Sequence, residues 1–213
     1  MKYVILDIET SGLVPKGADY KQDFMVFPYI LSMAWKINDQ PTYEYIINQE
    51  NKPVPPEATA INGITDAMCQ ASKFNTFSTI LQFMMDSADA DFIIGYNLYF
   101  DTSIIKANFL RIIEVNKKTP MIAFDKLTDI LHKDKRIDIM RACAKLFGGK
   151  WPTLSEAYTR LFQEQFNAHS AGEDVDATYR IFQELIRLNA IKIALPEKVV
   201  AEVAQKIIAE EEI

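Results

Sequence analysis

The stretch that decides the fold is residues 3–12, YVILDIETSG. Its first four residues are apolar, Asp7 and Glu9 flank Ile8, and Gly12 ends the run, which is typical of a buried strand that ends in two carboxylates. Side chains two positions apart in a strand point to the same side, so Asp7 and Glu9 project together. Such a pair is costly unless a positive charge lies between them, and hard oxygen ligands suit Mg²⁺ or Mn²⁺. The alternative is a solvent-facing acidic pair on an edge strand.

Length and composition are those of one globular domain. The chain has 213 residues, of which 49% are hydrophobic and 24% charged, so it is large enough to bury a core. No apolar run is long enough to span a membrane. The apolar start is interrupted at Asp7, unlike a signal peptide. Cys69 and Cys143 stand apart with no metal-ligand spacing, so we expect reduced core residues in a cytoplasmic protein.

Charge is distributed unevenly along the chain. The net charge of −6 argues against binding nucleic acid by bulk electrostatics alone. Between Lys106 and Lys150, however, 11 basic residues stand against 5 acidic ones. This stretch either guides a polyanion or forms a solvated helical surface.

The remaining chain predicts an α/β fold. Strands are expected over residues 29–37, 42–47 and 91–97, and the short connection between the first two favours an antiparallel meander. Residues 121–137 are ambiguous, with a strand at 121–124 and a short helix near 127–131 as one interpretation. Further helices are expected over residues 57–61, 66–70, 74–88, 97–115, 138–147, 154–162 and 170–189. An apolar stripe after Pro196 indicates one more helix, so we expect a domain over residues 1–190 and a helical extension over 191–213.

Capping signals define three helix starts. Asn97 is a predicted N-cap, which places Asp101 in the first turn of its helix. A carboxylate there also favours the helix dipole, so a structural role is the alternative. A capping box at Thr153-x-x-Glu156 opens a later helix.

The third helix start involves the chain's second informative segment. Ser170-x-x-Glu173 is another predicted capping box. It places His169 just outside the helix and Asp174 just inside its first turn, so both side chains can face one cavity. The alternative is a capped helix with an incidental histidine.

Taken together, the motifs resemble the DEDDh exonucleases, the superfamily that includes the epsilon proofreading subunit of bacterial DNA polymerase III, ribonuclease T and oligoribonuclease. The resemblance covers about residues 1–190 and rests on three motifs in the family's order, Asp7-x-Glu9, Asn97-x-x-Phe100-Asp101 and His169-x4-Asp174. Each motif is weak alone, but three in order and in the expected structural context form a strong signal. The segment Asn62-Gly-Ile-Thr also resembles the family's His-Gly-Ile-Thr, with asparagine in place of histidine. Tyr96 stands where many members have histidine.

The resemblance implies an RNase H-like fold, with a mixed five-stranded sheet flanked by helices. It also implies two divalent cations, Mg²⁺ or Mn²⁺, which assist phosphodiester hydrolysis by stabilising the attacking and leaving oxygens. The implied metal ligands are Asp7, Glu9, Asp101 and Asp174, and the implied general base is His169. The implied substrate contacts are Thr10, Ser11, Gly12, Leu13, Asn97 and Phe100. Aromatic residues there would stack on bases, although a core position is equally consistent with Phe100.

The predicted function is that of a metal-dependent 3′→5′ exonuclease, which releases nucleoside monophosphates from single-stranded DNA ends. The resemblance to the epsilon subunit adds a DNA polymerase subunit as an expected partner, and no membrane partner is expected. Trimming of RNA 3′ ends is the alternative, because contacts to the 2′-hydroxyl are not visible in the motifs. A haloacid-dehalogenase-type phosphatase would need a second aspartate where Glu9 stands and has no use for His169. A non-catalytic polymerase- or nucleic-acid-binding module would have lost one of the five motif residues, and all five are present.

Overall fold

The protein is described by a computed structural model that covers residues 1–49, 52–117 and 119–191. Its centre is a five-stranded sheet with the order β3-β2-β1-β4-β5. The strands are β1 (Tyr3–Thr10), β2 (Ile30–Ile37), β3 (Tyr43–Ile46), β4 (Phe92–Gly95) and β5 (Arg136–Asp138). β1, β2 and β3 are antiparallel neighbours, whereas β4 and β5 run parallel to β1. This is the mixed five-stranded sheet that the sequence predicts.

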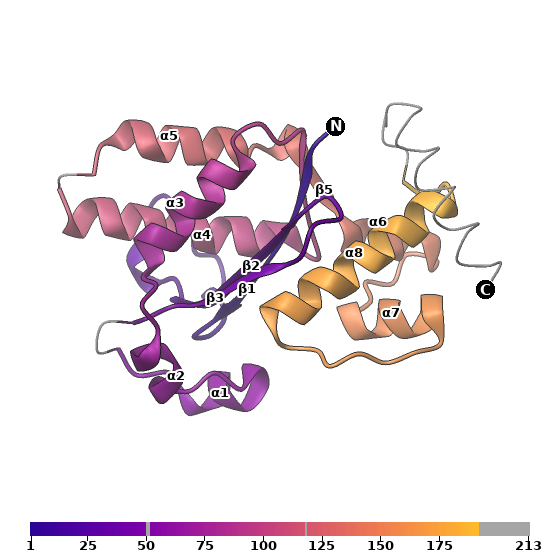
Figure 1. The fold of residues 1–213 in the computed structure, drawn as a ribbon, viewed down its shortest axis with the longest axis horizontal. Coiled ribbons are helices and arrows are strands. Elements are labelled where there is room, and N and C mark those ends of the chain that lie inside the picture. The colour runs from indigo at the N-terminus through magenta and orange to yellow at the C-terminus, as the bar shows by residue number, and fades with distance from the viewer. Residues whose placement is uncertain (50–51, 118, 192–213) are drawn as a thin grey trace.

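Helices cover both faces of the sheet (Figure 1). One face carries α3 (Thr76–Ser87), α4 (Leu98–Val115) and α5 (Met121–Ile130). The other face carries α6 (Ile139–Leu146), α7 (Leu154–Phe162) and α8 (Ala171–Arg187). The shorter helices are α1 (Pro56–Asn62), α2 (Asp66–Ala71), η1 (Phe24–Val26) and η2 (Lys133–Lys135).

The alternation of side chains along β1 decides which helices each of them meets. Its buried even-numbered residues pack with α3, α4 and α5, whereas Tyr3 and Ile5 pack with α6, α7 and α8. Asp7 and Glu9 continue the row of Tyr3 and Ile5 because their spacing is two. The acidic pair therefore ends an apolar row on the face that α8 covers.

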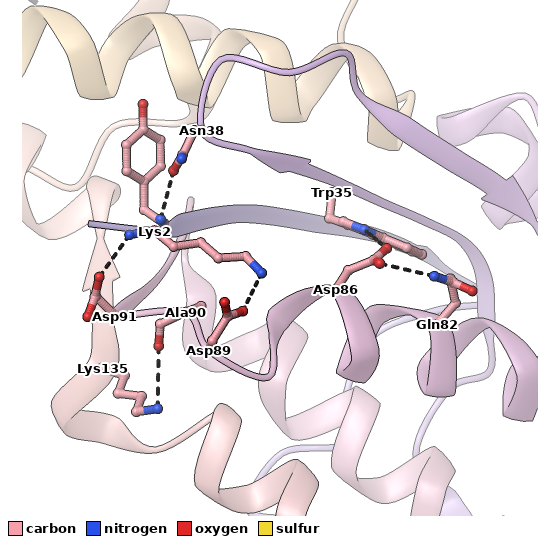
Figure 2. Close-up of polar contacts among 10 residues, drawn as sticks. Lys2, Trp35, Asn38, Gln82, Asp86, Asp89, Ala90, Asp91 and Lys135 are labelled. Carbon is pink, nitrogen blue, oxygen red and sulfur yellow. Dashed lines mark hydrogen bonds and ion pairs between the residues drawn. The ribbon is translucent and has the colours of Figure 1, made fainter. Parts of the chain in front are cut away.

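The start of β1 is held by polar groups that are all paired (Figure 2). The backbone N–H of Lys2 donates to Asp91 at 2.8 Å, and its ammonium forms an ion pair with Asp89. The N–H of Tyr3 donates to the side chain of Asn38 at 2.9 Å. These bonds fix the strand at the end opposite to the acidic pair.

A buried tryptophan anchors the face under α3. Trp35 is fully buried, stacks on Tyr45 with ring centroids 5.1 Å apart, and meets Phe83 edge-on at 5.8 Å. Its indole N–H donates to Asp86 at 3.0 Å, and Asp86 also accepts from Gln82 (Figure 2). The one polar atom of this large side chain is therefore satisfied, as burial requires.

One predicted strand is wrong, and one observed strand was not predicted. Residues 121–124 begin α5, because Phe124, Leu127 and Ile130 are buried at the three-residue spacing of a helix face. The unpredicted strand is Arg136–Asp138, which pairs with β4 at the edge of the described sheet and is too short to show a periodic pattern. The other predicted elements agree with the described structure to within two residues at each end.

Several cations of the basic stretch point inward and do not form an open surface. Lys106 and Arg136 both donate to the carbonyl of Leu131, at 3.3 Å and at 2.7–3.0 Å. Arg111 donates to the carbonyl of Phe27 at 2.6 Å. These side chains tie connecting segments to the core, which is a use that neither of the two sequence interpretations included.

Three further predictions concern the cysteines, membrane spans and the C-terminal extension. Cys69 and Cys143 are buried and free, as expected. Within the residues that the structure describes, no helix is long and apolar enough to cross a bilayer. Apart from Ile191, the predicted helical extension over residues 191–213 lies outside the described residues.

Candidate active site

Four carboxylates from three elements meet where β1 ends. Asp7 and Glu9 come from β1, Asp101 from the first turn of α4, and Asp174 from the first turn of α8. Burial raises the pKa of Asp7 well above its usual range, and the charges of Asp101, Asp174 and Glu9 raise it further. The structure thus brings together the four acidic residues that the motifs single out, although their roles stay predictions.

A close backbone approach brings Asp101 to β1. A Cβ at Gly95, the last residue of β4, would lie 2.7 Å from the Cδ1 of Leu98 and 3.0 Å from the carbonyl of Leu6, so glycine lets α4 start against β1. Asp101 is 3% exposed. Burial raises its pKa strongly, although its own N–H and that of Ile8 donate to the carboxylate and lower it.

Asn97 occupies the predicted N-cap position of α4, but its side chain does not cap the helix. Its backbone is left-handed, with φ 60° and ψ 43°. Its N–H donates instead to Asp138, at the end of β5, and Asp138 also accepts from the N–H of Arg141 to cap α6. The charge of Asp138 contributes to the raised pKa of Asp101. Asp138 was missed as a neighbour of the site because the strand that places it was not predicted.

The start of α8 brings Asp174 and His169 to Glu9. The N–H of His169 donates to Asp174 Oδ1 at 3.3 Å, which supports the left-handed backbone of His169 at φ 76°. Ligand atoms of Glu9, His169 and Asp174 lie within 4.8 Å of one another. Burial raises the pKa of Glu9 to about 7 and that of Asp174 to about 6. His169 is exposed, so the imidazole lies at the rim of a partly buried acidic site.

The capping box predicted at Ser170 is not formed. Ser170 occupies the N-cap position, but its side chain accepts no bond from the helix. Its hydroxyl donates instead to Glu44 Oε1, at 3.3 Å. By contrast, Thr153 and Glu156 form the predicted capping box of α7. Glu44 is an exposed residue of β3, and no motif in the sequence points to it.

Asn62 supports the end of β1 from the side of α1. Its side chain hydrogen-bonds to Glu9, which lowers the pKa of that carboxyl against the effect of burial. Its amide donates to the carbonyl of Thr10 at 3.4 Å. The residue that replaces the family's histidine is therefore a hydrogen-bond partner of the acidic site. Beside it opens a pocket of about 330 Å³, lined by Glu44, Ile46, Asn62, Ile64, Met68, Ser170 and Ala171.

Among the predicted substrate contacts at the end of β1, some side chains are hydrogen-bonded within the loop and one is exposed. The hydroxyl of Thr10 donates to the carbonyl of Gly12 at 2.7 Å, and that of Ser11 accepts from the N–H of Tyr29 at 2.8 Å. Leu13 is 84% exposed. The polar residues therefore shape the loop, and Leu13 is the side chain that is free to meet a ligand.

The aromatic residues after β4 point in different directions. Phe100 packs against the hydrophobic core, which favours the core interpretation. Its neighbour Tyr99 is 67% exposed and is not among the predicted contacts. Tyr96 donates to the carbonyls of Pro152 and Thr153 at 2.8 and 2.9 Å. It therefore ties β4 to the start of α7.

The acidic site has no cation of its own among the described residues. None of the ion pairs there joins a lysine or arginine to Asp7, Glu9, Asp101 or Asp174. Burial first, and then the charges of neighbouring carboxylates, explain the raised pKa values. Carboxylate oxygens are the donors that hard divalent cations prefer, and imidazole suits several transition metals. The residues therefore fit a divalent-cation site.

Comparison with known proteins agrees with this geometry. A family model described as Exonuclease (RNase_T) matches residues 4–182. No curated protein sequence matches the chain.

Several solved structures share the fold. E. coli exonuclease I in complex with a dT13 oligonucleotide has a TM-score of 0.62 at 22% identity, over 87% of this chain and 41% of that one. The zinc-bound complex of E. coli exonuclease I with single-stranded DNA has 0.64 at 21%, over 88% and 40%. Exonuclease X in complex with 5′ overhanging duplex DNA has 0.53 at 15%, over 94% and 98%. The chain thus spans about two-fifths of the length of exonuclease I.

The family model covers well over half of the chain and includes every motif residue. The solved structures share its mixed sheet and flanking helices. The chain belongs to the DEDDh exonuclease family.

Proposed function

We propose that the protein is a metal-dependent 3′→5′ exonuclease that removes nucleoside monophosphates from single-stranded DNA ends. The observation that carries this proposal is the meeting of Asp7, Glu9, Asp101 and Asp174, with no lysine or arginine ion-paired to them in the described part of the chain and with His169 at the rim. A structural cluster of this kind would be expected to contain a lysine or arginine.

The proposed chemistry divides among the five residues. Divalent cations, when bound, supply Lewis acidity that stabilises charge on the scissile phosphate. Asp7 is close enough to Asp101, Asp174 and Glu9 for their charges to act on it, and these four carboxylates would hold the cations. Exposure leaves the imidazole of His169 free to accept the proton of the attacking water. Water oxygen then bonds to phosphorus, the bond to the 3′ oxygen of the preceding nucleotide breaks, and a nucleoside 5′-monophosphate leaves.

Support for a DNA strand comes from the solved relatives and from the rim of the site. Exonuclease I was solved with single-stranded DNA, and exonuclease X with overhanging duplex DNA. Leu13 follows the end of β1, Tyr99 lies two residues before Asp101, and both side chains are exposed. The ring of Tyr99 suits stacking on bases of any sequence, and Leu13 suits apolar contact with them. A net charge of −6 makes local contacts of this kind more important than general attraction to a polyanion.

Matched DNA and RNA oligonucleotides of one sequence test the proposal. Each is labelled either at its 5′ or at its 3′ end and incubated with Mg²⁺, Mn²⁺ or chelator. We expect a 5′-labelled DNA ladder, early release of the 3′ label as a mononucleotide, and no digestion with chelator. Preference for RNA would replace the proposed substrate, and inertness of both strands with either metal would reject the function.

The assigned base is tested with the chain's two histidines. His169→Ala should reduce digestion by about 10²- to 10⁴-fold, the range for a general base. His132→Ala is the matched control, because His132 is the residue just before η2, is not part of the Glu9, His169 and Asp174 group, and is also solvent-accessible. Full activity of His169→Ala would show that the base is wrongly assigned.

A further inference from the structure

We propose that Glu44, on the edge strand β3, is a positioning residue that fixes the first turn of α8 and thereby holds His169 and Asp174 against the end of β1. The inference rests on the proposed function, since it concerns how the same site is assembled. None of the three motifs includes Glu44.

The register of the sheet aims Glu44 at the acidic site. Asp7 pairs with Ala34, and Ala34 pairs with Glu44, so the three residues form one row across β1, β2 and β3. Directly paired residues point to the same face of a sheet, which here is the face under α8. The small side chain of Ala34 leaves space between the two carboxylates, and the start of α8 enters there.

Contacts from the sheet and from α8 surround the Glu44 carboxylate. Its Oε1 accepts hydrogen bonds from the hydroxyl of Ser32, on β2, and from that of Ser170, both at 3.3 Å. A Cβ at Gly172 would lie 2.5 Å from its Oε2, so the absence of a side chain at position 172 makes room for the carboxylate. Glu44 therefore bridges the sheet and the helix start.

This bridge acts on the segment that carries the proposed base and ligand. Ser170 is the direct neighbour of His169, whose left-handed backbone needs support from surrounding contacts. A carboxylate at a helix N-terminus also interacts favourably with the helix dipole. The charge of Glu44 raises the pKa of Glu9 and of Asp174, which agrees with its closeness to both. Loss of the bridge would leave the start of α8 attached through fewer contacts.

Steady-state kinetics on labelled single-stranded DNA separate positioning from charge. Glu44→Ala removes both hydrogen bonds, so we expect kcat to fall by about 10- to 100-fold with little change in KM, as for a misplaced catalytic group. Glu44→Gln keeps an acceptor oxygen for both hydroxyls and should recover most of kcat. Glu173→Ala is the matched control, because it removes an acidic side chain from the same first turn and should leave kcat unchanged. A Glu44→Gln enzyme as slow as Glu44→Ala would overturn the positioning role.

A cycle with Gly172→Ala tests the contact without relying on activity. With Glu44 present, the added methyl group must displace the carboxylate from its place beside Gly172, so we expect Gly172→Ala to raise the melting temperature less, or to lower it more, than it does without Glu44. In the Glu44→Ala background no carboxylate is displaced and alanine suits a helix better than glycine, so the same change should be neutral or stabilising. Equal effects of Gly172→Ala in both backgrounds would overturn the inferred contact. If the wild type digests no strand, the proposed function fails, and this cycle still decides whether Glu44 holds α8.

Discussion

Acidic side chains near the two ends of β1 differ in the partners that they have. At its start, Asp89 pairs with the ammonium of Lys2, and Asp91 accepts from a backbone N–H (Figure 2). At its end, Asp7 and Glu9 meet further carboxylates with no basic side chain paired to them among the described residues. The carboxylates at the start of β1 have a cation or an N–H donor as partner. The carboxylates at its end lack a basic partner, which makes a bound cation the expected counter-charge.

This difference has an energetic meaning. A carboxylate whose pKa is raised in the folded state is less stable when charged there than in the unfolded chain. Burial and mutual repulsion have this effect on Asp7, Glu9, Asp101 and Asp174. Without a bound metal, the folded protein keeps this electrostatic destabilisation. Such a loss of stability is expected where a site is built for function.

The largest expected effect is a loss of nuclease activity on substitution at the end of β1, compared with no loss on substitution near its start. Asp7→Asn should reduce digestion of single-stranded DNA by about 10³-fold or more, because the variant loses the carboxylate that we propose as a central ligand of the cation site. Asp91→Asn, at the start of the same strand, should retain wild-type activity. Single-turnover rates in Mg²⁺ measure both. Comparable losses in the two variants would remove the functional distinction between the ends.

The same substitution should stabilise the protein without metal. In chelator, Asp7→Asn removes one of several mutually repelling charges, so its free energy of unfolding should rise by about 1–2 kcal/mol. Added Mg²⁺ should raise the melting temperature of the wild type more than that of the variant. Urea unfolding and thermal melts with and without the cation measure these shifts. A destabilised Asp7→Asn in chelator would contradict the repulsion.

Stability should also depend on pH in a direction set by this site. Glu9 titrates at about 7 and Asp174 at about 6 in the folded protein, against 4.5 and 3.8 ordinarily. Between these values the folded state binds more protons than the unfolded state, so stability is fully present below the ordinary pKa and is lost as pH rises through the folded one. In chelator, the free energy of unfolding should fall by about 2–3 kcal/mol from pH 5.5 to 8. Saturating Mg²⁺ should flatten this slope.

The smallest expected effect is a loss of stability on substitution of Asp86, an acidic residue that has a hydrogen-bond donor. Asp86→Ala leaves the buried indole N–H of Trp35 without its partner, which should cost about 1 kcal/mol of stability. The loss should be independent of Mg²⁺ and should leave digestion unchanged. Urea unfolding with and without Mg²⁺ measures it, and a Mg²⁺-dependent loss would mean that Asp86 also acts on the cation site.

Sequence-based prediction succeeds here where the signal is local. The shared direction of Asp7 and Glu9 follows from strand alternation alone, and the capping box of Thr153 and Glu156 depends on residues three apart. Sequence-based prediction fails where a residue far away in the sequence binds the side chain that the local pattern assigns to a cap. Ser170 has the pattern of a cap, but its hydroxyl bonds to Glu44 from another strand.

The sequence by itself determined the position of each motif, the elements that carry them and the family. Only the tertiary structure decided that Glu44 and Asp138 border the same acidic site, because sheet register and strand order bring them there. It also decided that Asn62 supports Glu9. The physical reason is that periodicity and capping act over a few residues, whereas the pairing of strands joins segments whose separation in sequence carries no local signal.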